Sequence, residues 1–303
     1  MTTVVNDWRE KVGNQRDWIW RGWKIRYTYL RSREGNNHKP PLIFLHGFGG
    51  SIGQWRYNLE ALSQHYTIYA MDMLGFGATE KAPVRYNVKI WVEQVYDFWR
   101  TLINRPVVLI GHSTGSLISL AAAQNHPEMV SGIVMMSIAD PSIEREAIPP
   151  ILQPIVASIK SVVASPVLLK PLFYFLRQPS VLRRWAGLAY ANPKAVTDEL
   201  VDILAAPPRD RGSARVFSQL FRGTIRTDFG PSVKKVLPTL SIPMLLIWGN
   251  QDRFIPPTFA KEFASYNQNV QLIQLDNAGH CPYDECYEQV NPVILDWMDK
   301  FID

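Results

Sequence analysis

Residues 107–115 read VVLIGHSTG, and this stretch determines how the rest of the chain is interpreted. The four apolar residues at 107–110 are typical of a fully buried parallel strand. The next five match G-x-S-x-G, the pattern of a sharp strand-to-helix turn that carries a nucleophilic serine. Small and apolar residues at 116–123 predict the helix that follows. Strand, turn and helix in succession therefore indicate Ser113 as a nucleophile.

The spacing around Ser113 has a physical reason. Gly111 and Gly115 stand two residues before and after it, where larger side chains would collide across the turn. Such a turn forces Ser113 into a strained backbone conformation. A helix that begins at this point directs free N–H groups, and the positive end of its dipole, at any anion that forms beside the serine.

The composition is that of a folded globular protein. The chain has 303 residues, of which 47% are hydrophobic and 19% charged. This length suits one large α/β domain with an insertion, or two domains. The two cysteines, Cys281 and Cys286, are too few for a disulfide framework, and their spacing fits no zinc site. The low number of cysteines suggests a reducing compartment. We expect no metal and no cofactor.

The N-terminal residues show neither the charge pattern nor the apolar run of a signal peptide. No apolar run reaches the length of about 18 residues that a membrane-spanning helix needs. We therefore expect a cytoplasmic protein. The net charge of +5 fits simple solubility, and it also fits peripheral contact with an anionic membrane surface.

Predicted strands alternate with helices over most of the chain. A hairpin is expected around Arg21 and Gly22. Buried strands are predicted at 42–45 and 132–136, and further strands at 66–71, 242–249 and 270–275. This alternation predicts an α/β fold with a parallel sheet. We expect it to form a core domain from residues 1–139 and 238–303.

Residues 140–237 interrupt the alternation. They are rich in proline, apolar and basic residues, and they predict short helices at 151–163, 167–176, 181–189 and 194–204. We expect a helical cap over the active site, with a large apolar pocket. The expected lining residues are Ile155, Ile159, Leu172 and Phe173; packing of the cap on the core is the alternative for each of them.

Two residues complete the chemistry that Ser113 needs. His280 follows the last predicted strand and can take the serine proton as a general base. Asp252 follows the preceding strand and can orient the imidazole. The order Ser, Asp, His and their positions at the ends of strands fit a catalytic triad. Asp140 is the alternative acid, or a substrate contact where the cap begins.

The glycine-rich residues 46–50, HGFGG, follow the first buried strand. The N–H of Phe48 is expected to form, with the N–H of Thr114, an oxyanion hole of two donors. An ordinary glycine turn is the alternative. His112 directly precedes Ser113, and we expect it to orient a loop beside the substrate.

From about residue 20 to the C-terminus the chain resembles the α/β-hydrolase superfamily. The motifs that carry the resemblance are HGFG at 46–49, DMLGFG at 72–77, GHSTG at 111–115, WGNQD at 248–252 and GH at 279–280. The resemblance implies an α/β-hydrolase fold: a mostly parallel sheet of the eight-stranded type, helices on both faces and a helical cap insertion. A serine at the nucleophile position argues against haloalkane dehalogenases and epoxide hydrolases, which this fold also hosts.

The segment around His280 is similar to that of pheophytinases and chlorophyll dephytylases, which cut the phytyl ester of chlorophyll pigments. It reads GHCPYDE at 279–285, followed by EQVN at 288–291. Thr114 and Tyr283 depart from that group, which usually has Leu and often has His at these places. GHSTG also resembles cofactor-free haloperoxidases, which are serine esterases. These resemblances imply a serine hydrolase that cleaves the ester of a bulky lipophilic molecule, with a phytyl ester as one candidate.

Other functions fit the same residues. A lipid or carotenoid ester hydrolase and an acyltransferase would use the same triad. A receptor that binds a hydrophobic ligand without turnover is the alternative outside enzymology, and a complete triad weighs against it because binding alone needs no base. We expect a small lipophilic ester as partner and no nucleic acid; the oligomeric state is left open.

Overall fold

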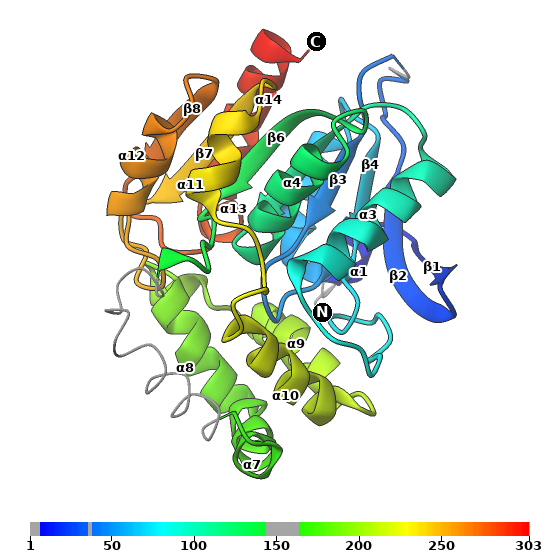
Figure 1. Ribbon diagram of the computed structural model, residues 1–303, viewed down its shortest axis with the longest axis vertical. Helices are drawn as coiled ribbons and strands as arrows, with labels where there is room; N and C mark the ends of the chain where they lie inside the picture. The colour runs from blue at the N-terminus through cyan, green and yellow to red at the C-terminus, as the bar shows by residue number, and fades with distance from the viewer. Residues whose placement is uncertain (1–6, 36–37, 144–163, 303) are drawn as a thin grey trace, which may run out of the picture.

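The computed structural model describes residues 7–35, 38–143 and 164–302. These residues form one eight-stranded sheet in the order β1-β2-β4-β3-β5-β6-β7-β8 (Figure 1). The strands are β1 (Gln15–Trp20), β2 (Trp23–Leu30), β3 (Leu42–Leu45), β4 (Ile68–Met71), β5 (Val107–His112), β6 (Val130–Met136), β7 (Met244–Gly249) and β8 (Val270–Leu275). β1 and β2 pair antiparallel with each other and β2 with β4, whereas every other pair is parallel. The expected mostly parallel sheet of the α/β type is confirmed.

Local sequence explains the central strands and the hairpin. β3, β5 and β7 are buried along their whole length, as their continuous apolar sequences predict for strands covered on both faces. The β1–β2 turn is made by Arg21 and Gly22, which both have positive φ, at 51° and 84°. Two successive positive φ angles are the geometry of a type I′ turn, whose twist matches that of the strands.

Helices cover both faces of the sheet (Figure 1). One face packs against α3 (Val88–Leu102), α4 (Thr114–Asn125), α11 (Val233–Val236) and α12 (Thr258–Ser265). The other packs against α1 (Trp8–Lys11), α2 (Arg56–Leu62), α13 (Pro282–Glu285) and α14 (Tyr287–Phe301). Successive strand residues alternate between the two cores, with Ile43 in one and Phe44 in the other. Each fully buried side chain of this size stabilises the fold by about 1.5–3 kcal/mol.

Between β6 and β7, four helices of the described residues lie away from the sheet and are here called the inserted helices. They are α7 (Pro166–Leu176), α8 (Pro179–Ala189), α9 (Asp198–Ala205) and α10 (Ser213–Thr224), and they lie together at the lower end of the molecule in Figure 1. The division of the chain at 139/140 and 237/238 stays a prediction. The helix predicted for 151–163 lies outside the described residues. In the described ranges, no helix is long and apolar enough to cross a membrane.

The predicted helix at 194–204 begins later than expected, at Asp198. Pro193–Ala195 forms a separate turn of 3-10 helix, and the Thr197 hydroxyl then caps α9 by accepting the N–H of Leu200 at 3.2 Å. A threonine at this position favours the start of a new helix, because its hydroxyl accepts one of the first N–H groups, which have no partner within the helix.

Candidate active site

Ser113 occupies the sharp turn between β5 and α4. Its φ of 51° and ψ of −114° lie in a strained region for a residue with a side chain. A Cβ on Gly111 would lie 2.5 Å from the backbone of Gly115, closer than atoms can approach. The turn therefore requires glycine where the sequence pattern has it, and it holds Ser113 at the carboxyl end of a central strand.

Two hydrogen bonds fix this turn to its surroundings. The Ser113 N–H donates to the Met136 carbonyl on β6 at 2.8 Å, and the Ser116 hydroxyl donates to the Gly111 carbonyl at 2.8 Å. Because Thr114 is the first residue of α4, its N–H has no acceptor within the helix. That N–H is thus available to an anion next to Ser113.

His280 and Asp252 form a buried pair. His280 Nδ1 lies 2.8 Å from Asp252 Oδ2, and the Asp252 side chain is fully buried. The second carboxylate oxygen, Oδ1, accepts the N–H groups of Phe254 at 2.8 Å and Ile255 at 2.9 Å. These N–H groups hold the carboxylate in place, and the carboxylate orients the imidazole through Nδ1. The other ring nitrogen, Nε2, is then left to accept a proton from a substrate or a serine.

His112 supports the loop that carries His280. Its Nε2 lies 2.9 Å from the His280 carbonyl oxygen, and the two rings meet edge to face with centroids 4.8 Å apart. The pKa of His112 lies well below its usual value, mainly because the ring is buried and also because His280 lies nearby. A neutral His112 can donate through Nε2 to this carbonyl, so the contact positions the loop.

The glycine-rich loop after β3 approaches Ser113 closely. A Cβ on Gly47 would lie 2.8 Å from His112 Nδ1 and 3.2 Å from Ser113 Cβ. The adjoining Phe48 lines the same cavity as Ser113. A side chain at 47 would push this loop away, so the glycine permits the loop to approach Ser113 closely.

A cavity of about 570 Å³ contains Ser113 and His280 in its lining. The inserted helices contribute a large apolar part of its wall, which includes Phe173, Leu176, Leu182, Trp185 and Phe217. Gln54 and Arg177 are the further long polar side chains of the described lining. The site therefore combines reactive polar groups at one point with a large apolar wall.

One expected pocket residue is not found in this wall. Leu172 was expected to line the pocket, but its side chain is 41% exposed and lies outside the cavity. The reason is helical spacing, which places Leu169 and Phe173 on the buried face of α7 and Leu172 on the outer face. Ile155 and Ile159 lie outside the described residues.

Asp140 does not meet His280. Its carboxylate accepts the N–H of Ser142 at 2.7 Å and that of Val233 at 2.9 Å. It thus joins the point where the chain leaves the sheet after β6 to the start of α11. The structure brings Asp252, and not Asp140, to the imidazole.

A buried charged cluster beside the site was not predicted. Arg56 on α2 forms ion pairs with Asp284 on α13 at 2.9 Å and with Glu199 on α9 at 2.7 Å. The Tyr190 hydroxyl donates to Asp284, and burial raises the pKa of that carboxyl. Asp284 lies in the segment around His280, but nothing in the spacing of Arg56 or Glu199 indicates that they meet it.

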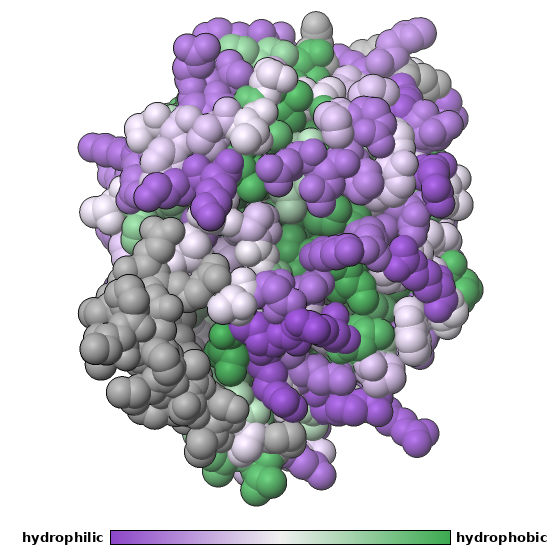
Figure 2. Space-filling view, viewed as in Figure 1, coloured by the Kyte–Doolittle hydropathy of each residue, from purple (hydrophilic) through white to green (hydrophobic). Residues whose placement is uncertain are grey.

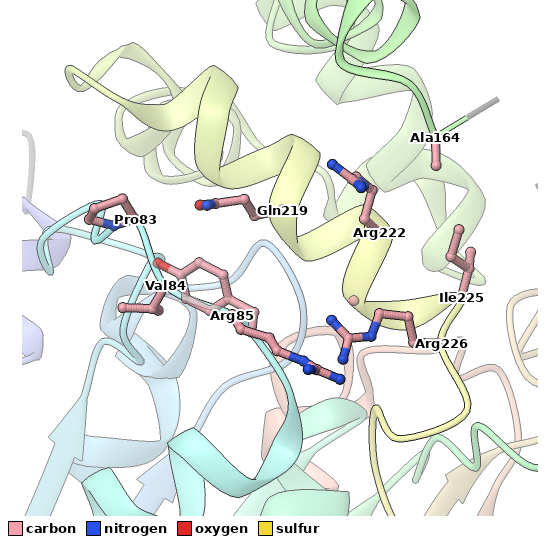
Figure 3. A pocket seen from close by; sticks show the side chains of 10 residues that line it. Pro83, Val84, Arg85, Ala164, Gln219, Arg222, Ile225 and Arg226 are labelled. Atoms are coloured by element: carbon pink, nitrogen blue, oxygen red, sulfur yellow. The ribbon is translucent and has the colours of Figure 1, made fainter. Parts of the chain in front are cut away.

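A second cavity, of about 520 Å³, is separate from Ser113 and His280 (Figure 3). It lies between residues 83–86 and α10 and is lined by Arg85, Arg222 and Arg226. Arg85 and Arg226 both pair with Asp228.

In the part of the chain that the structure describes, no three His, Cys, Asp or Glu side chains gather as a metal site requires.

Known proteins resemble the chain over most of its length. The chain is 25% identical over 285 residues to epoxide hydrolase 3 of Xenopus tropicalis, covering 91% of this chain and 75% of that protein. Chloroplastic pheophytinase of Arabidopsis thaliana is 20% identical over 312 residues, covering 91% of this chain and 64% of the relative. Among solved structures, a meta-cleavage product hydrolase from Pseudomonas fluorescens superposes with a TM-score of 0.77 at 20% identity, covering 96% of this chain and 99% of that one.

The family assignment rests on the match to a family sequence model. The sequence model of the α/β-hydrolase fold family matches residues 40–286, which include the turn at Ser113 and the loops of Asp252 and His280. This span exceeds half of the chain and agrees with the sheet order and with the motifs. The protein therefore belongs to the α/β-hydrolase fold family.

Proposed function

We propose that the protein is a serine hydrolase that cleaves the carboxylic ester of a bulky lipophilic molecule through an acyl-enzyme on Ser113. One observation carries the proposal: a strained serine and a histidine bound to a buried aspartate line one apolar cavity. Nucleophile, base and orienting carboxylate are the groups that acyl transfer needs.

In the first half of the proposed reaction, His280 Nε2 takes the proton of Ser113 as the Oγ attacks the ester carbonyl. The resulting oxyanion accepts hydrogen bonds from the N–H groups of Phe48 and Thr114, each such donor contributing about 10²–10³-fold in rate. His280 then gives the proton to the leaving alcohol. The Asp252 carboxylate stabilises the imidazolium while it carries that proton.

In the second half, water attacks the acyl-enzyme. His280 removes a proton from the water, the oxyanion forms again in the same place, and the proton returns to Ser113 Oγ as the acid leaves. An alcohol that competes with water at this step would make the protein an acyltransferase. The cavity wall supports an apolar acyl or alcohol group, because burying each CH₂ contributes about 0.8 kcal/mol.

The most specific candidate is the phytyl ester of chlorophyll or pheophytin. It is supported by the similarity of residues 279–291 to pheophytinases and by the match to the Arabidopsis pheophytinase. The cavity falls within the range of about 300–1,000 Å³ typical of small-molecule sites. A hydrolase of other lipid or carotenoid esters, and an esterase like the cofactor-free haloperoxidases, are alternatives. Serine at position 113 favours ester cleavage over the epoxide opening that one relative's name records.

The proposal is tested by hydrolysis of p-nitrophenyl esters of increasing chain length, alongside chlorophyll a and pheophytin a, with the wild type and with Ser113→Ala. Release of phytol by the wild type alone supports the dephytylase. Cleavage of simple esters alone supports the hydrolase and rejects the pigment substrate. Ligand binding without any turnover would favour the receptor.

We place the protein in the cytoplasm, in peripheral contact with a membrane.

A further inference from the structure

Exposed apolar side chains gather on two of the inserted helices. Seven of the twelve exposed large hydrophobic residues in the described ranges lie on α7 and α8. On α7, Val167 is 80% exposed, Phe175 61%, Leu168 52% and Leu172 41%. These four residues, here called the α7 outer face, form a contiguous apolar strip that faces away from the protein.

α7 is apolar on both sides. Leu169 and Phe173 are buried on its inner face, and Phe173 lines the cavity with Ser113. Lys170 is the one charged residue of the helix. A helix that faces water normally has a polar outer face. α7 lies at the lower end of the molecule in Figure 1, and Figure 2 shows apolar surface at that end. The outer face thus lacks the polarity that water contact favours.

The sequence of α7 and α8 has basic residues and no acidic one, and Asp198, which follows, pairs with Arg183. Between residues 164 and 197 the sequence has five cations, Lys170, Arg177, Arg183, Arg184 and Lys194, and no acidic residue. A cavity of about 380 Å³ between α7 and α10 is lined by Lys170, Arg215 and Arg222, without a carboxylate among its described residues. Figure 3 shows the guanidinium of Arg222 apart from those of Arg85 and Arg226. Helical spacing places Lys170 next to Val167 and away from Leu168 and Leu172, so the cations border the apolar strip along one edge.

We propose that α7 docks the protein on an anionic lipid bilayer. The α7 outer face enters the acyl boundary, and Lys170, Arg215 and Arg222 bind lipid phosphates. Apolar residues beside cations match a bilayer, which offers both acyl chains and phosphates. A symmetric dimer through this face would bring the same cations of two copies together, and a nucleic acid would leave the apolar strip uncovered.

Docking in this way places the catalytic cavity beside the bilayer, since the inner face of α7 lines that cavity. A lipophilic substrate would then reach Ser113 without passing through bulk water. This route of entry rests on the proposed hydrolase function, whereas docking itself does not. Binding to vesicles therefore tests the docking even if the ester substrate is wrong.

The test is co-sedimentation of the full chain with vesicles of equal parts phosphatidylglycerol and phosphatidylcholine, and with phosphatidylcholine alone. We expect binding to the anionic vesicles only, weakened at least tenfold by Leu168→Ser/Phe175→Ser. The matched control Ile19→Ser/Phe301→Ser removes two exposed apolar side chains elsewhere (65% and 43% exposed) and should change binding less than twofold. Circular dichroism melting and hydrolysis of p-nitrophenyl acetate should be unchanged in both variants.

The cations are tested separately. Lys170→Gln/Arg222→Gln should weaken binding at least tenfold and flatten its dependence on salt, whereas Lys89→Gln/Arg100→Gln on α3 should leave both unchanged. The proposal is overturned if the wild type stays unbound, if it binds neutral vesicles equally, or if Leu168→Ser/Phe175→Ser binds like the wild type. A concentration-dependent dimer that this variant abolishes would also overturn it, by assigning the face to a second copy.

Discussion

The backbone N–H of His280 donates a hydrogen bond to the carbonyl of Ala189, at 2.6 Å, and so joins the loop of the proposed base to the end of α8. Glu285 strengthens the same junction, because its carboxylate accepts the N–H groups of Gly279 at 2.8 Å, Ala191 at 3.0 Å and Asn192 at 2.5 Å. The position of His280 therefore depends on the inserted helices as well as on the sheet.

Glu285→Gln should lower kcat for short esters about tenfold, with little change in KM. The amide loses the negative charge and one acceptor oxygen, and hydrogen bonds to charged groups contribute about 1.5–3 kcal/mol. Glu288→Gln is the matched control, since Glu288 is exposed three residues further along. Steady-state kinetics on p-nitrophenyl butyrate measure both. An unchanged kcat in Glu285→Gln would show that the junction does not position His280.

Asp252→Asn should lower kcat on the order of 10³–10⁴-fold, because an amide favours the wrong imidazole tautomer and does not stabilise the imidazolium. Asp140→Asn should keep kcat within about threefold while lowering the free energy of unfolding by about 1 kcal/mol, because the Asp140 carboxylate binds the backbone N–H groups of Ser142 and Val233. Kinetics and urea unfolding separate the two effects. Comparable losses of kcat in both variants would contradict the assignment of Asp252.

His46 should make stability depend on pH. Its Nδ1 lies 2.7 Å from the Gly47 carbonyl and its Nε2 accepts the Met73 N–H at 3.0 Å, which requires the neutral ring. Burial lowers its pKa from 6.5 to about 4. Because the folded pKa is depressed, this stabilisation is complete above pH 6.5 and is lost as the pH falls towards 4.

The loss from His46 amounts to about 3 kcal/mol, at 1.36 kcal/mol per pKa unit. Urea unfolding of the wild type and of His46→Asn between pH 7.5 and 4 isolates it, since asparagine does not titrate in this range. The wild type should lose its advantage over the variant as the pH falls. A constant difference across the range would show that His46 keeps an ordinary pKa.

Arg56→Ala should lower the free energy of unfolding by about 3–5 kcal/mol, because it leaves the Asp284 carboxylate buried without its cation. Adding Asp284→Asn should restore part of this loss. Arg9→Ala, which breaks an exposed pair with Asp7, should cost less than about 1 kcal/mol. Chemical unfolding measures all three. A loss in Arg56→Ala no larger than in Arg9→Ala would show that the cluster does not join α2 to α13.

Much of the fold follows from sequence because the parallel strands are apolar on both faces. The strands predicted at 42–45 and 270–275 have the observed bounds. The turn at Ser113 was predictable because its backbone leaves no room for a side chain at Gly111 or Gly115. The start of a helix that a side chain caps, such as Thr197 at α9, was harder to predict, because several nearby residues could serve equally well as the cap.

Side-chain placement in the inserted helices could not be predicted in the same way. Leu172 and Phe173 are neighbours of similar hydrophobicity, and only the packing of α7 on α10 decides which one faces the cavity. The contact of Arg56 with Asp284 joins residues from opposite ends of the chain. Such pairs depend on tertiary structure and leave no periodic signal in the sequence.

Covalent labelling tests most directly whether Ser113 is the nucleophile. The wild type and Ser113→Ala are treated with a fluorophosphonate, and adducts are located by mass spectrometry of peptides, with melting curves to confirm that both are folded. We predict one adduct, on Ser113, absent from Ser113→Ala, and formed at least about 100-fold more slowly in His280→Gln because the base is lost. An adduct on another residue, or equal labelling of Ser113→Ala, would contradict the assignment of Ser113 as the nucleophile.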